Sequence, residues 1–244
     1  MAQIIDYSDS TLLIPSKFDL ERDAVAAAWE NAGGSVIRVD KFWEPPGIDN
    51  RSIKLYGDSV FCLVLEEKLG LILVSPDDYV LEKLDSKWLK RKINIIRLDE
   101  INESAFPVLA KALIPKQFRS GVYNSAGDLM HECRGLSEET EILISEIVLF
   151  ECDIRCFILN GQIMAIGLYE GNADVNSAKQ FADRFISDTR NKQLLTNTYV
   201  LDIGYIQERG WAVIEINPSW GSGLNGCVPE EVIRCIYYAT LSRG

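Results

Sequence analysis

Histidine is nearly absent from this sequence, because His131 is the only one among 244 residues. Sites that need several histidine ligands for zinc or iron are therefore excluded, and a catalytic triad would have to use that one residue. We interpret His131, which lies in a polar segment, as a structural or surface residue. Any catalysis is expected to depend on carboxylates, lysines, arginines or a thiol.

The cysteines lack any C-x-x-C spacing and lie mostly inside apolar stretches, at positions 62, 133, 152, 156, 227 and 235. In a chain of this length we interpret them as reduced core residues, which predicts a cytoplasmic location. A basic N-terminus followed by an apolar segment is also missing, as is any run of about 18 apolar residues. We therefore expect neither a standard secretion signal nor a membrane span.

Positive charge is scarce, since 25 lysines and arginines stand against 36 aspartates and glutamates, for a formal net charge of −11. A negative field repels nucleic-acid phosphates and anionic lipids, and no basic run offsets it locally. We expect neither nucleic acid nor a membrane as a partner, and the sequence leaves the oligomeric state open. Hydrophobic residues at 47% and charged residues at 25% are ordinary for a globular protein.

Residues 1–92 alternate short apolar runs with helical patterns, which predicts an α/β domain. Residues 11–15 and 35–39 are expected to be parallel strands around a helix capped by Asp19. A strand at IKLYG, a helix that begins at Asp58 or Ser59 and ends at Gly70, and a strand at 71–74 are expected next. Pro76 and the acidic residues behind it predict a single helix over 77–92.

Residues 93–244 have longer apolar runs, which predict antiparallel sheets. Asn160-Gly161 separates two such runs and favours a type I′ hairpin turn. A second hairpin is expected over the last apolar runs, with its turn around residues 208–210. Helices are predicted over 172–193 and from Pro229 onward.

Three oxygen-bearing side chains stand out in the second hairpin, namely Asp202, Glu215 and Asn217. Glu215 and Asn217 are two residues apart and share one strand face, and pairing through the turn sets Asp202 roughly opposite Glu215. Oxygen ligands without histidine or thiolate suit Mg²⁺, or alternatively Mn²⁺, shared with substrate phosphates. The alternative is that these residues form a solvated face of the hairpin.

Basic residues form the second constellation. Lys111 and Arg155 lie in apolar strands, where a cation needs a cleft or a carboxylate partner, while Lys116 and Arg119 lie in a following loop. Lysine and arginine suit phosphate oxygens. The alternatives are a structural ion pair of Arg155 with Asp153, and solvated charges for the loop residues.

Taken in order, these motifs resemble the ATP-grasp superfamily of carboxylate-amine ligases, and in particular the ribosomal-protein glutamate ligases. The motifs are K-x4-K-x4-G-V at 111–122, S-E-I-V at 145–148, D-I-R at 153–155, L-D-I at 201–203 and E-I-N-P-S at 215–219. The resemblance implies an α/β (α+β) fold with an N-terminal pre-ATP-grasp domain, residues 1–92, and an ATP-grasp module with antiparallel sheets enclosing the nucleotide, residues 93–244. The loop expected to cover the phosphates has few small residues, which is typical of a compact, divergent clade.

The same resemblance implies roles for single residues. Lys111 and Lys116 would contact the ATP phosphates, and Arg155 would bind the γ-phosphate and the transition state, so that Arg155 and Lys111 are the catalytic candidates. Asp202, Glu215 and Asn217 would hold Mg²⁺. The remaining nucleotide-binding candidates are Glu146, Ile147, Val148, Glu151 and Asp153, with the backbone at 146–148 facing adenine and Glu146 or Glu151 reaching the adenosine.

The implied function is an ATP-dependent ligase that joins a small-molecule or peptide carboxylate to an amine through an acylphosphate. One alternative is a kinase that stops at phosphorylation. Another is a nucleotide-binding regulatory module without turnover, although such a module has little need for two metal-binding carboxylates. The sequence does not identify either substrate.

Overall fold

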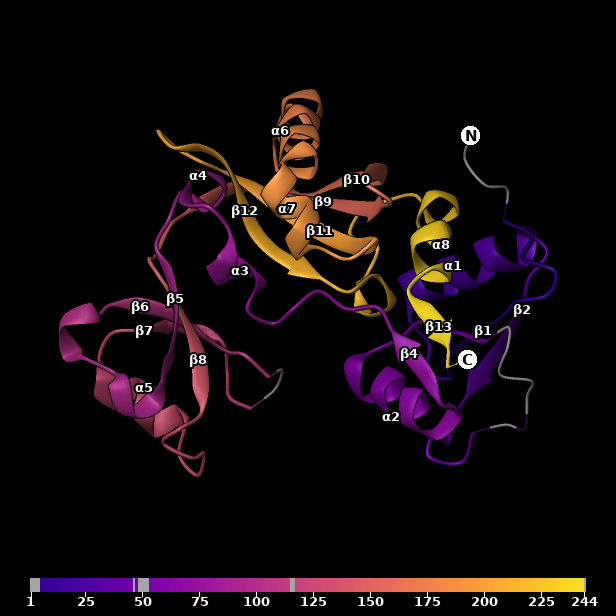
Figure 1. Cartoon of the computed structure of the whole chain (residues 1–244), viewed down its shortest axis with the longest axis horizontal. Coiled ribbons are helices and arrows are strands. Elements are labelled where there is room, and N and C mark those ends of the chain that lie inside the picture. Colours follow the sequence, from indigo (N-terminus) through magenta and orange to yellow (C-terminus); the bar gives the residue numbers. More distant parts are fainter. Residues whose placement is uncertain (1–4, 46, 48–52, 115–116, 244) are drawn as a thin grey trace. The chain divides into compact units, whose positions relative to one another are not determined.

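The computed structural model describes residues 5–45, 47, 53–114 and 117–243, and within these the chain is a mixed α/β protein (Figure 1). The chain divides into two compact units. Unit 1 contains residues 1–76, 152–203 and 215–244, and unit 2 contains residues 77–151 and 204–214. These units cut across the two predicted segments, and the boundary at 92–93 stays a prediction about sequence modules.

Unit 1 begins with the predicted β-α-β arrangement, followed by a second helix and a short strand. Its three parallel strands have the order β2-β1-β3, and helix α1 begins after Asp19, whose side chain accepts a hydrogen bond from Arg22 N. Helix α2 begins after Asp58 and ends at Gly70, which has a φ of +61°. Both predicted caps are therefore confirmed. The elements are β1 (Thr11–Pro15), α1 (Leu20–Asn31), β2 (Ser35–Val39), β3 (Ile53–Leu55), α2 (Ser59–Leu69) and β4 (Leu71–Leu73).

A four-stranded sheet of order β10-β9-β11-β12 follows later in the chain. Asn160 and Gly161 have φ values of +49° and +73°, as the predicted hairpin turn between β9 and β10 requires. The strands are β9 (Phe150–Leu159), β10 (Gln162–Gly171), β11 (Thr198–Ile206) and β12 (Gly210–Asn217), and the ends of β11 and β12 around their shared turn are counted to unit 2.

The chain continues through the short 3₁₀ helix η4 (Ser219–Gly221) and the predicted helix α8 (Pro229–Tyr237). A further strand, β13 (Thr240–Ser242), pairs antiparallel with β4 and was not predicted. Its three residues are too few to produce a recognisable alternation.

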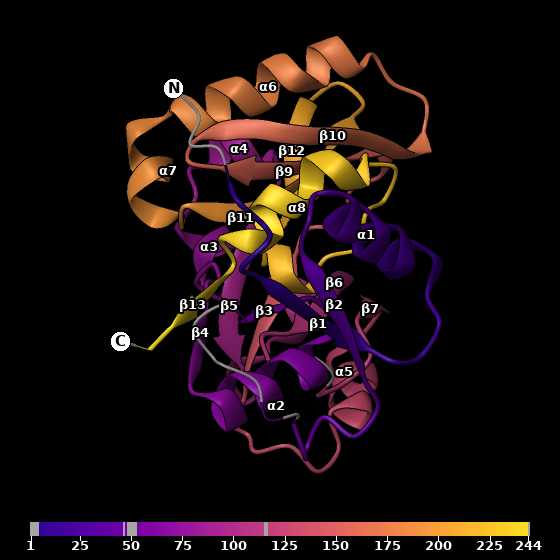
Figure 2. The same cartoon turned by 90° about the vertical axis from the view of Figure 1, so that its right-hand side faces the viewer.

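One hydrophobic core explains why unit 1 joins segments far apart in the sequence. Val25 and Trp29 of α1 pack with Phe157 of β9, Val200 of β11 and Ile233 of α8. Figure 2 shows α1 and α8 side by side above the first sheet. Full burial of each such side chain contributes roughly 1.5–3 kcal/mol, so the first and last segments of the chain stabilise each other.

Unit 2 contains an antiparallel sheet of order β5-β8-β6-β7, in agreement with the sequence prediction. Ala110 and Ile142 of the sheet pack on Leu129 of helix α5. His131 lies on the same helix and is exposed. The elements are β5 (Ile93–Arg97), η2 (Leu98–Glu100), η3 (Glu103–Ala105), β6 (Val108–Ala112), β7 (Gly121–Tyr123), α5 (Ala126–Glu132) and β8 (Glu141–Ser145).

The single helix predicted over 77–92 is wrong. Unit 2 has two short helices there, α3 (Val80–Lys83) and α4 (Ser86–Leu89), separated by Leu84 in an extended conformation. The Asp85 side chain accepts a hydrogen bond from Lys87 N and so begins a new helix. An aspartate that bonds nearby backbone amides competes with helix continuation.

The helix predicted over 172–193 is also interrupted. It consists of α6 (Val175–Ser187) and α7 (Thr189–Leu194), with Asp188 extended between them. The Asp188 side chain accepts hydrogen bonds from Arg190 N and Asn191 N, which is again an N-cap inside a helical pattern.

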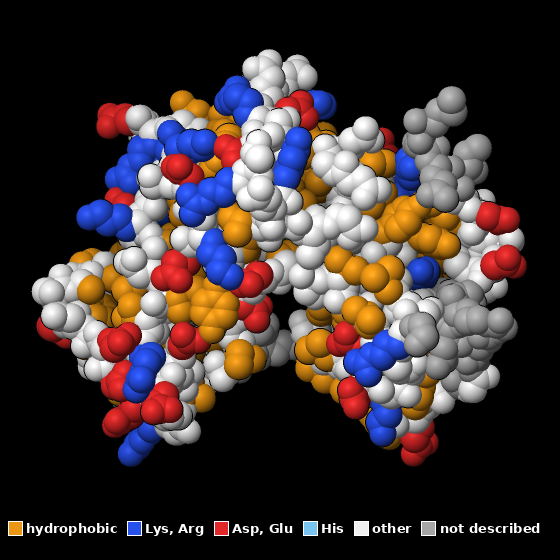
Figure 3. All heavy atoms as spheres, in the orientation of Figure 1, with side chains coloured by type: hydrophobic (Ala, Val, Ile, Leu, Met, Phe, Trp, Pro, Cys, Tyr) orange, Lys and Arg blue, Asp and Glu red, His pale blue; other side chains and the backbone are white. Residues whose placement is uncertain are grey.

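Apolar side chains are exposed beside α2 and β4, as Figure 3 shows in orange. Val60 and Leu63 of α2 are 49% and 51% exposed, and Ile72 of β4 is 42% exposed. Ile72 pairs with Leu241 of β13, which is exposed to a similar degree. This side of the β4–β13 pair is therefore apolar and open.

The cysteine prediction is confirmed, because all six cysteines are buried thiols. Among the described ranges, no helix has the length and apolar character needed to cross a membrane.

Candidate functional site

A buried ion pair lies at the centre of the sheet in unit 1. Arg155 of β9 donates from Nε to Asp202 Oδ1 at 2.8 Å and from Nη2 to Asp202 Oδ2 at 2.6 Å. Both residues are buried, and Asp202 of β11 is 1% exposed. The carboxylate partner expected for Arg155 is therefore present, and it is Asp202 rather than Asp153. Paired hydrogen bonds of this geometry are the strong form of the arginine–carboxylate interaction.

Two residues of β12 complete this cluster. Asn217 Nδ2 donates to Asp202 Oδ2 at 3.3 Å. Burial raises the pKa of Asp202, and the negative charge of Glu215 raises it further, against the opposing effect of Arg155. The three side chains singled out in the sequence, Asp202, Glu215 and Asn217, therefore influence one another within unit 1.

Asp153 occupies the same strand as Arg155 but has a different partner, Tyr169. The Tyr169 hydroxyl donates to Asp153 Oδ2 at 3.3 Å, and the Arg155 guanidinium lies 5.9 Å from the centre of the Tyr169 ring. Tyr169 stands where the register of β10 shifts between Leu168 and Glu170. Such a bulge redirects a side chain, which places this tyrosine over the ion pair.

The loop after β12 is fixed to the same cluster. Arg155 Nη1 donates to Gly223 O at 2.9 Å. The two carboxylate oxygens of Glu21, in the first turn of α1, accept hydrogen bonds from Leu224 N and Asn225 N, each at 2.9 Å. A Cβ on Gly223 would lie 2.5 Å from Glu21 Oε2, so this close approach requires glycine.

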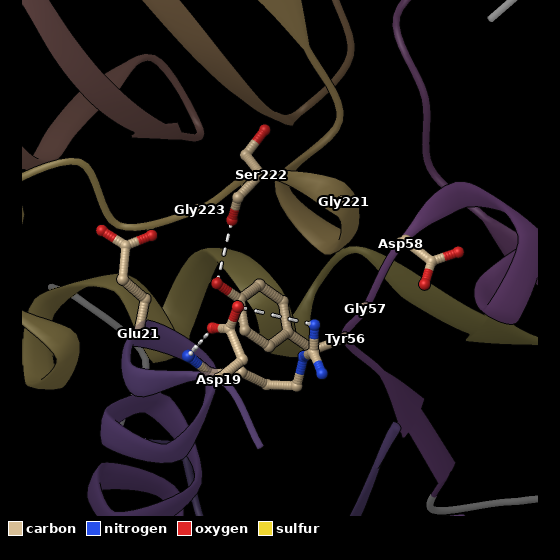
Figure 4. Close-up of a pocket in the computed structure, with 9 residues that line it drawn as sticks. Asp19, Glu21, Tyr56, Gly57, Asp58, Gly221, Ser222 and Gly223 are labelled. Carbon is tan, nitrogen blue, oxygen red and sulfur yellow. Dashed lines mark hydrogen bonds and ion pairs between the residues drawn. The ribbon is translucent and has the colours of Figure 1, made fainter. Parts of the chain in front are cut away.

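This loop also forms one wall of a pocket of about 180 Å³ within unit 1. Figure 4 shows Tyr56 in the middle, with its hydroxyl directed at Ser222 and with Glu21 and Asp58 on opposite sides. The Tyr56 hydroxyl donates to Ser222 O at 2.9 Å. The lining residues are Asp19, Glu21, Arg22, Tyr56, Gly57, Asp58, Gly221, Ser222 and Gly223.

The oxygen ligands in unit 1 fit a hard divalent cation. Burial raises the pKa of Asp153, and the charges of Asp202 and Glu215 raise it further, so added positive charge would relieve repulsion among these carboxylates. Among the residues that the structure describes, no three His, Cys, Asp or Glu side chains form a metal-binding group. A cation there needs the Asn217 oxygen and ligands from outside the chain, which is the usual situation for Mg²⁺ on phosphates.

The other predicted nucleotide-binding residues lie in unit 2. Lys111 is half-buried on β6, on the face opposite the core residue Ala110. Lys116 lies outside the described residues. Glu151 is exposed at the start of β9.

The predicted hinge, residues 146–149, is an extended linker between β8 and β9. Glu146 Oε1 accepts a hydrogen bond from Arg209 Nη2 at 2.8 Å, and its Oε2 accepts one from Lys92 N at 3.1 Å. Its side chain is therefore used within unit 2, whereas Ile147 is 42% exposed and Val148 is partly exposed.

Glu21 and Tyr169 were missed by the sequence reasoning. Glu21 is an ordinary acidic residue in the first turn of a helix, and no local pattern indicates that a loop about 200 residues later will bind to it. Tyr169 closes an apolar run beside Glu170, and an interruption of strand alternation there was the only usable signal.

Comparison with protein families finds a match over residues 88–235, to a family described as an ATP-grasp domain, the second family of its clade. A comparison with curated protein sequences finds no match.

Solved structures give a consistent result for the fold. A RimK domain ATP-grasp protein of Sphaerobacter thermophilus is 13% identical with a TM-score of 0.63, covering 93% of this chain and 99% of the other. A D-alanine–D-alanine ligase of Bacillus anthracis is 10% identical with a TM-score of 0.57, covering 94% and 96%. The ATP-grasp ligase PsnB, complexed with a precursor peptide and AMPPNP, is 11% identical with a TM-score of 0.51, covering 98% and 99%.

Proposed function

This chain belongs to the ATP-grasp superfamily, in the clade family whose model it matches, and from that membership we propose that it is an ATP-dependent ligase that joins a carboxylate to an amine. The substrates we propose are a small-molecule or peptide carboxylate and an amine acceptor. The peptide option is supported by the fold shared with PsnB, which is complexed with a precursor peptide. Six buried thiols support a reducing, cytoplasmic setting.

The observation that carries the proposal is the buried group of Arg155, Asp202, Glu215 and Asn217. Arg155 uses three N–H groups on Asp202 and Gly223 O. A guanidinium has five, so two remain for phosphate oxygens. Burying such a group costs stability unless it is paired, and its position next to hard oxygen ligands supports a role beyond folding.

We assign nucleotide contacts to residues of each unit. Arg155 would bind the γ-phosphate, and Lys111 would bind phosphate oxygens as a point charge. The linker backbone at Ile147 and Val148 would hydrogen-bond adenine. Glu151 is a better candidate than Glu146 for the adenosine, because both Glu146 oxygens already accept hydrogen bonds.

Mg²⁺ would be held by Asp202, Glu215 and the Asn217 amide oxygen, where it would neutralise phosphate charge. Asp202 accepts three hydrogen bonds, one on Oδ1 and two on Oδ2, which leaves a lone pair on Oδ1. Asn217 donates through Nδ2, so its Oδ1 is the ligand atom. Asp153 adds a second layer of negative charge behind these residues.

The proposed chemistry has two steps. A substrate carboxylate oxygen bonds to the γ-phosphorus while the bond to the β–γ bridging oxygen breaks and ADP leaves. The amine nitrogen then bonds to the acyl carbon, and the carbon–oxygen bond to phosphate breaks with its electron pair. Arg155 stabilises the negative charge on the phosphoryl oxygens, a contribution that often dominates phosphoryl transfer.

The test is carboxylate-dependent ADP formation in the full chain, with hydroxylamine added to trap an acylphosphate as its hydroxamate. A panel of amino acids and short peptides supplies the carboxylate. We expect hydroxamate from the native chain and a loss of about hundredfold or more in Glu215→Gln and Arg155→Lys. Arg155→Lys keeps the charge but loses the paired geometry. Glu230→Gln, an exposed glutamate on α8, is the matched control and should retain full activity.

The outcomes separate the alternatives. ADP formation without any trapped hydroxamate would indicate a kinase. ATP-dependent thermal stabilisation without ADP would indicate a binding module. Full carboxylate-dependent ADP formation in both Glu215→Gln and Arg155→Lys would overturn the proposed mechanism.

A further inference from the structure

The pocket beside the ion pair has a size that suits a small chemical group. Its volume is about 180 Å³, and its walls come from the start of α1, the turn before α2 and the loop after β12. Pockets for drug-sized ligands are typically about 300–1,000 Å³. This one therefore admits the reactive end of a substrate rather than a large molecule.

The lining of the pocket is strongly asymmetric in charge. Three carboxylates, from Asp19, Glu21 and Asp58, accompany one guanidinium, from Arg22. Arg22 Nη2 lies 3.9 Å from Asp19 Oδ2, so part of its charge is already offset. The excess negative charge repels a carboxylate or phosphate and attracts a cation.

The field of these carboxylates also reaches the buried residue at the pocket's centre. Burial raises the pKa of the Tyr56 hydroxyl, and the charges of Glu21 and Asp19 raise it further. The hydroxyl therefore stays protonated and continues to donate to Ser222 O.

Two of the carboxylates have an oxygen that can meet a ligand. Asp58 uses Oδ1 to accept hydrogen bonds from Val60 N and Phe61 N at the start of α2. Asp19 uses Oδ1 to accept from Arg22 N at the start of α1. In both residues Oδ2 is the second, exposed acceptor, because both side chains belong to exposed residues.

The pocket is directly connected to the residue that we propose binds the γ-phosphate. Gly223 lines the pocket, and its carbonyl accepts the hydrogen bond from Arg155 Nη1 at 2.9 Å. Glu21 lines the pocket as well, and it fixes the same loop through Leu224 N and Asn225 N. A group in the pocket is therefore adjacent to the site of carboxylate activation within unit 1.

We propose that this pocket binds the amine substrate as its ammonium ion, between the Asp19 and Asp58 carboxylates. The assignment rests on the proposed ligase function, and it names the substrate whose charge matches the lining. On reaction, the nitrogen forms a bond with the acyl carbon and phosphate leaves. Of the two protons that the ammonium loses, one goes to the released phosphate and one to solvent.

The test measures binding, so it does not require turnover. The probes are the amides of single amino acids, which carry only an ammonium, and the matching N-acetyl amino acids, which carry only a carboxylate. Titration of the full native chain should show tighter binding of the amides, weakened by added salt. Asp19→Asn and Asp58→Asn should each weaken amide binding about twofold to fivefold, the range for exposed charge pairs.

Asparagine is the appropriate replacement because it caps a helix as well as aspartate does. Asp174→Asn is the matched control, since Asp174 is an exposed cap of α6 that does not line the pocket. It should bind the amides as the native chain does.

Equal or tighter binding of the N-acetyl amino acids would overturn the proposal. So would the absence of amide binding, or amide affinities in Asp19→Asn and Asp58→Asn equal to that of Asp174→Asn. The hydroxamate assay reports on the ligase function separately, because it detects acylphosphate formation without the amine substrate. Failure of one assay is thus distinguishable from failure of the other.

Discussion

Arg155 and Asp202 face each other across adjacent strands and form two hydrogen bonds, at 2.8 and 2.6 Å, in the interior of unit 1. Burial by itself lowers the pKa of Arg155, but the hydrogen bonds and the charge of Asp202 outweigh burial and raise it, so the guanidinium stays charged. The pair holds Arg155 in one orientation while two of its N–H groups stay available to a ligand. A cation aimed in this way would need little reorganisation to meet a phosphate.

The first prediction concerns the stability of this pair. Arg155→Ala should lower the free energy of unfolding by about 3–5 kcal/mol, because it leaves the Asp202 charge buried without a partner. Asp202→Ala should cost a similar amount, and the double variant should cost clearly less than the sum of the two. Urea unfolding of the four chains gives the coupling energy.

The exposed pair of Lys179 and Asp183 is the control for this cycle. Its atoms are 2.8 Å apart, a distance like that of the buried pair, but its side chains are about half exposed. Its coupling energy should be about 0.3–0.5 kcal/mol. An Arg155–Asp202 coupling as small as this would contradict the prediction.

Much of this cluster could be predicted from the sequence, because strands impose a simple geometry. Alternation along β12 places Glu215 and Asn217 on one face, and the hairpin turn brings Asp202 close to them. A basic residue in the apolar run of β9 requires a partner, and Asp202 is that partner. Glu21 could not be predicted, because its contacts depend on where a distant loop comes to rest.

The errors in helix prediction have a common physical origin. Asp85 and Asp188 sit inside helical patterns, and each side chain accepts hydrogen bonds from the amides that follow it. Hydrophobic periodicity continues through both positions, so the pattern alone predicts one helix. Local competition by the aspartate side chain decides the outcome.

The second prediction separates the two contacts of Tyr169. Tyr169→Phe removes the hydroxyl that donates to Asp153 but keeps the ring over Arg155. It should lower the free energy of unfolding by about 0.5–1.5 kcal/mol, and Tyr169→Leu should cost roughly 0.5–1 kcal/mol more. The pKa of Asp153 should rise in Tyr169→Phe, because the lost hydrogen bond lowers it.

Tyr205→Phe is the matched control for this experiment. Tyr205 is 36% exposed and packs its ring on Trp211, a contact that phenylalanine can retain. Its removal of a hydroxyl should change neither stability nor the Asp153 titration. If Tyr169→Phe behaved in the same way, the hydroxyl would have no role at Asp153.

The third prediction concerns Glu146, at the start of the linker in unit 2. Its hydrogen bond with Arg209 lowers its pKa, with a smaller contribution from Lys92 N. A carboxyl whose pKa is lower in the folded chain stabilises that chain above the ordinary pKa of about 4.3. This stabilisation is lost as the pH falls through the lowered value.

Arg209→Ala should therefore return the Glu146 pKa toward its ordinary range, which an NMR titration of the side-chain carboxyl in the full chain would measure. The stability difference between the native chain and Arg209→Ala should shrink on acidification. Arg209→Lys keeps the charge without the planar geometry and should give an intermediate pKa. An unchanged Glu146 pKa in Arg209→Ala would show that the pair does not hold this carboxylate. Glu146 would then be available to the adenosine, and the preference for Glu151 would no longer follow.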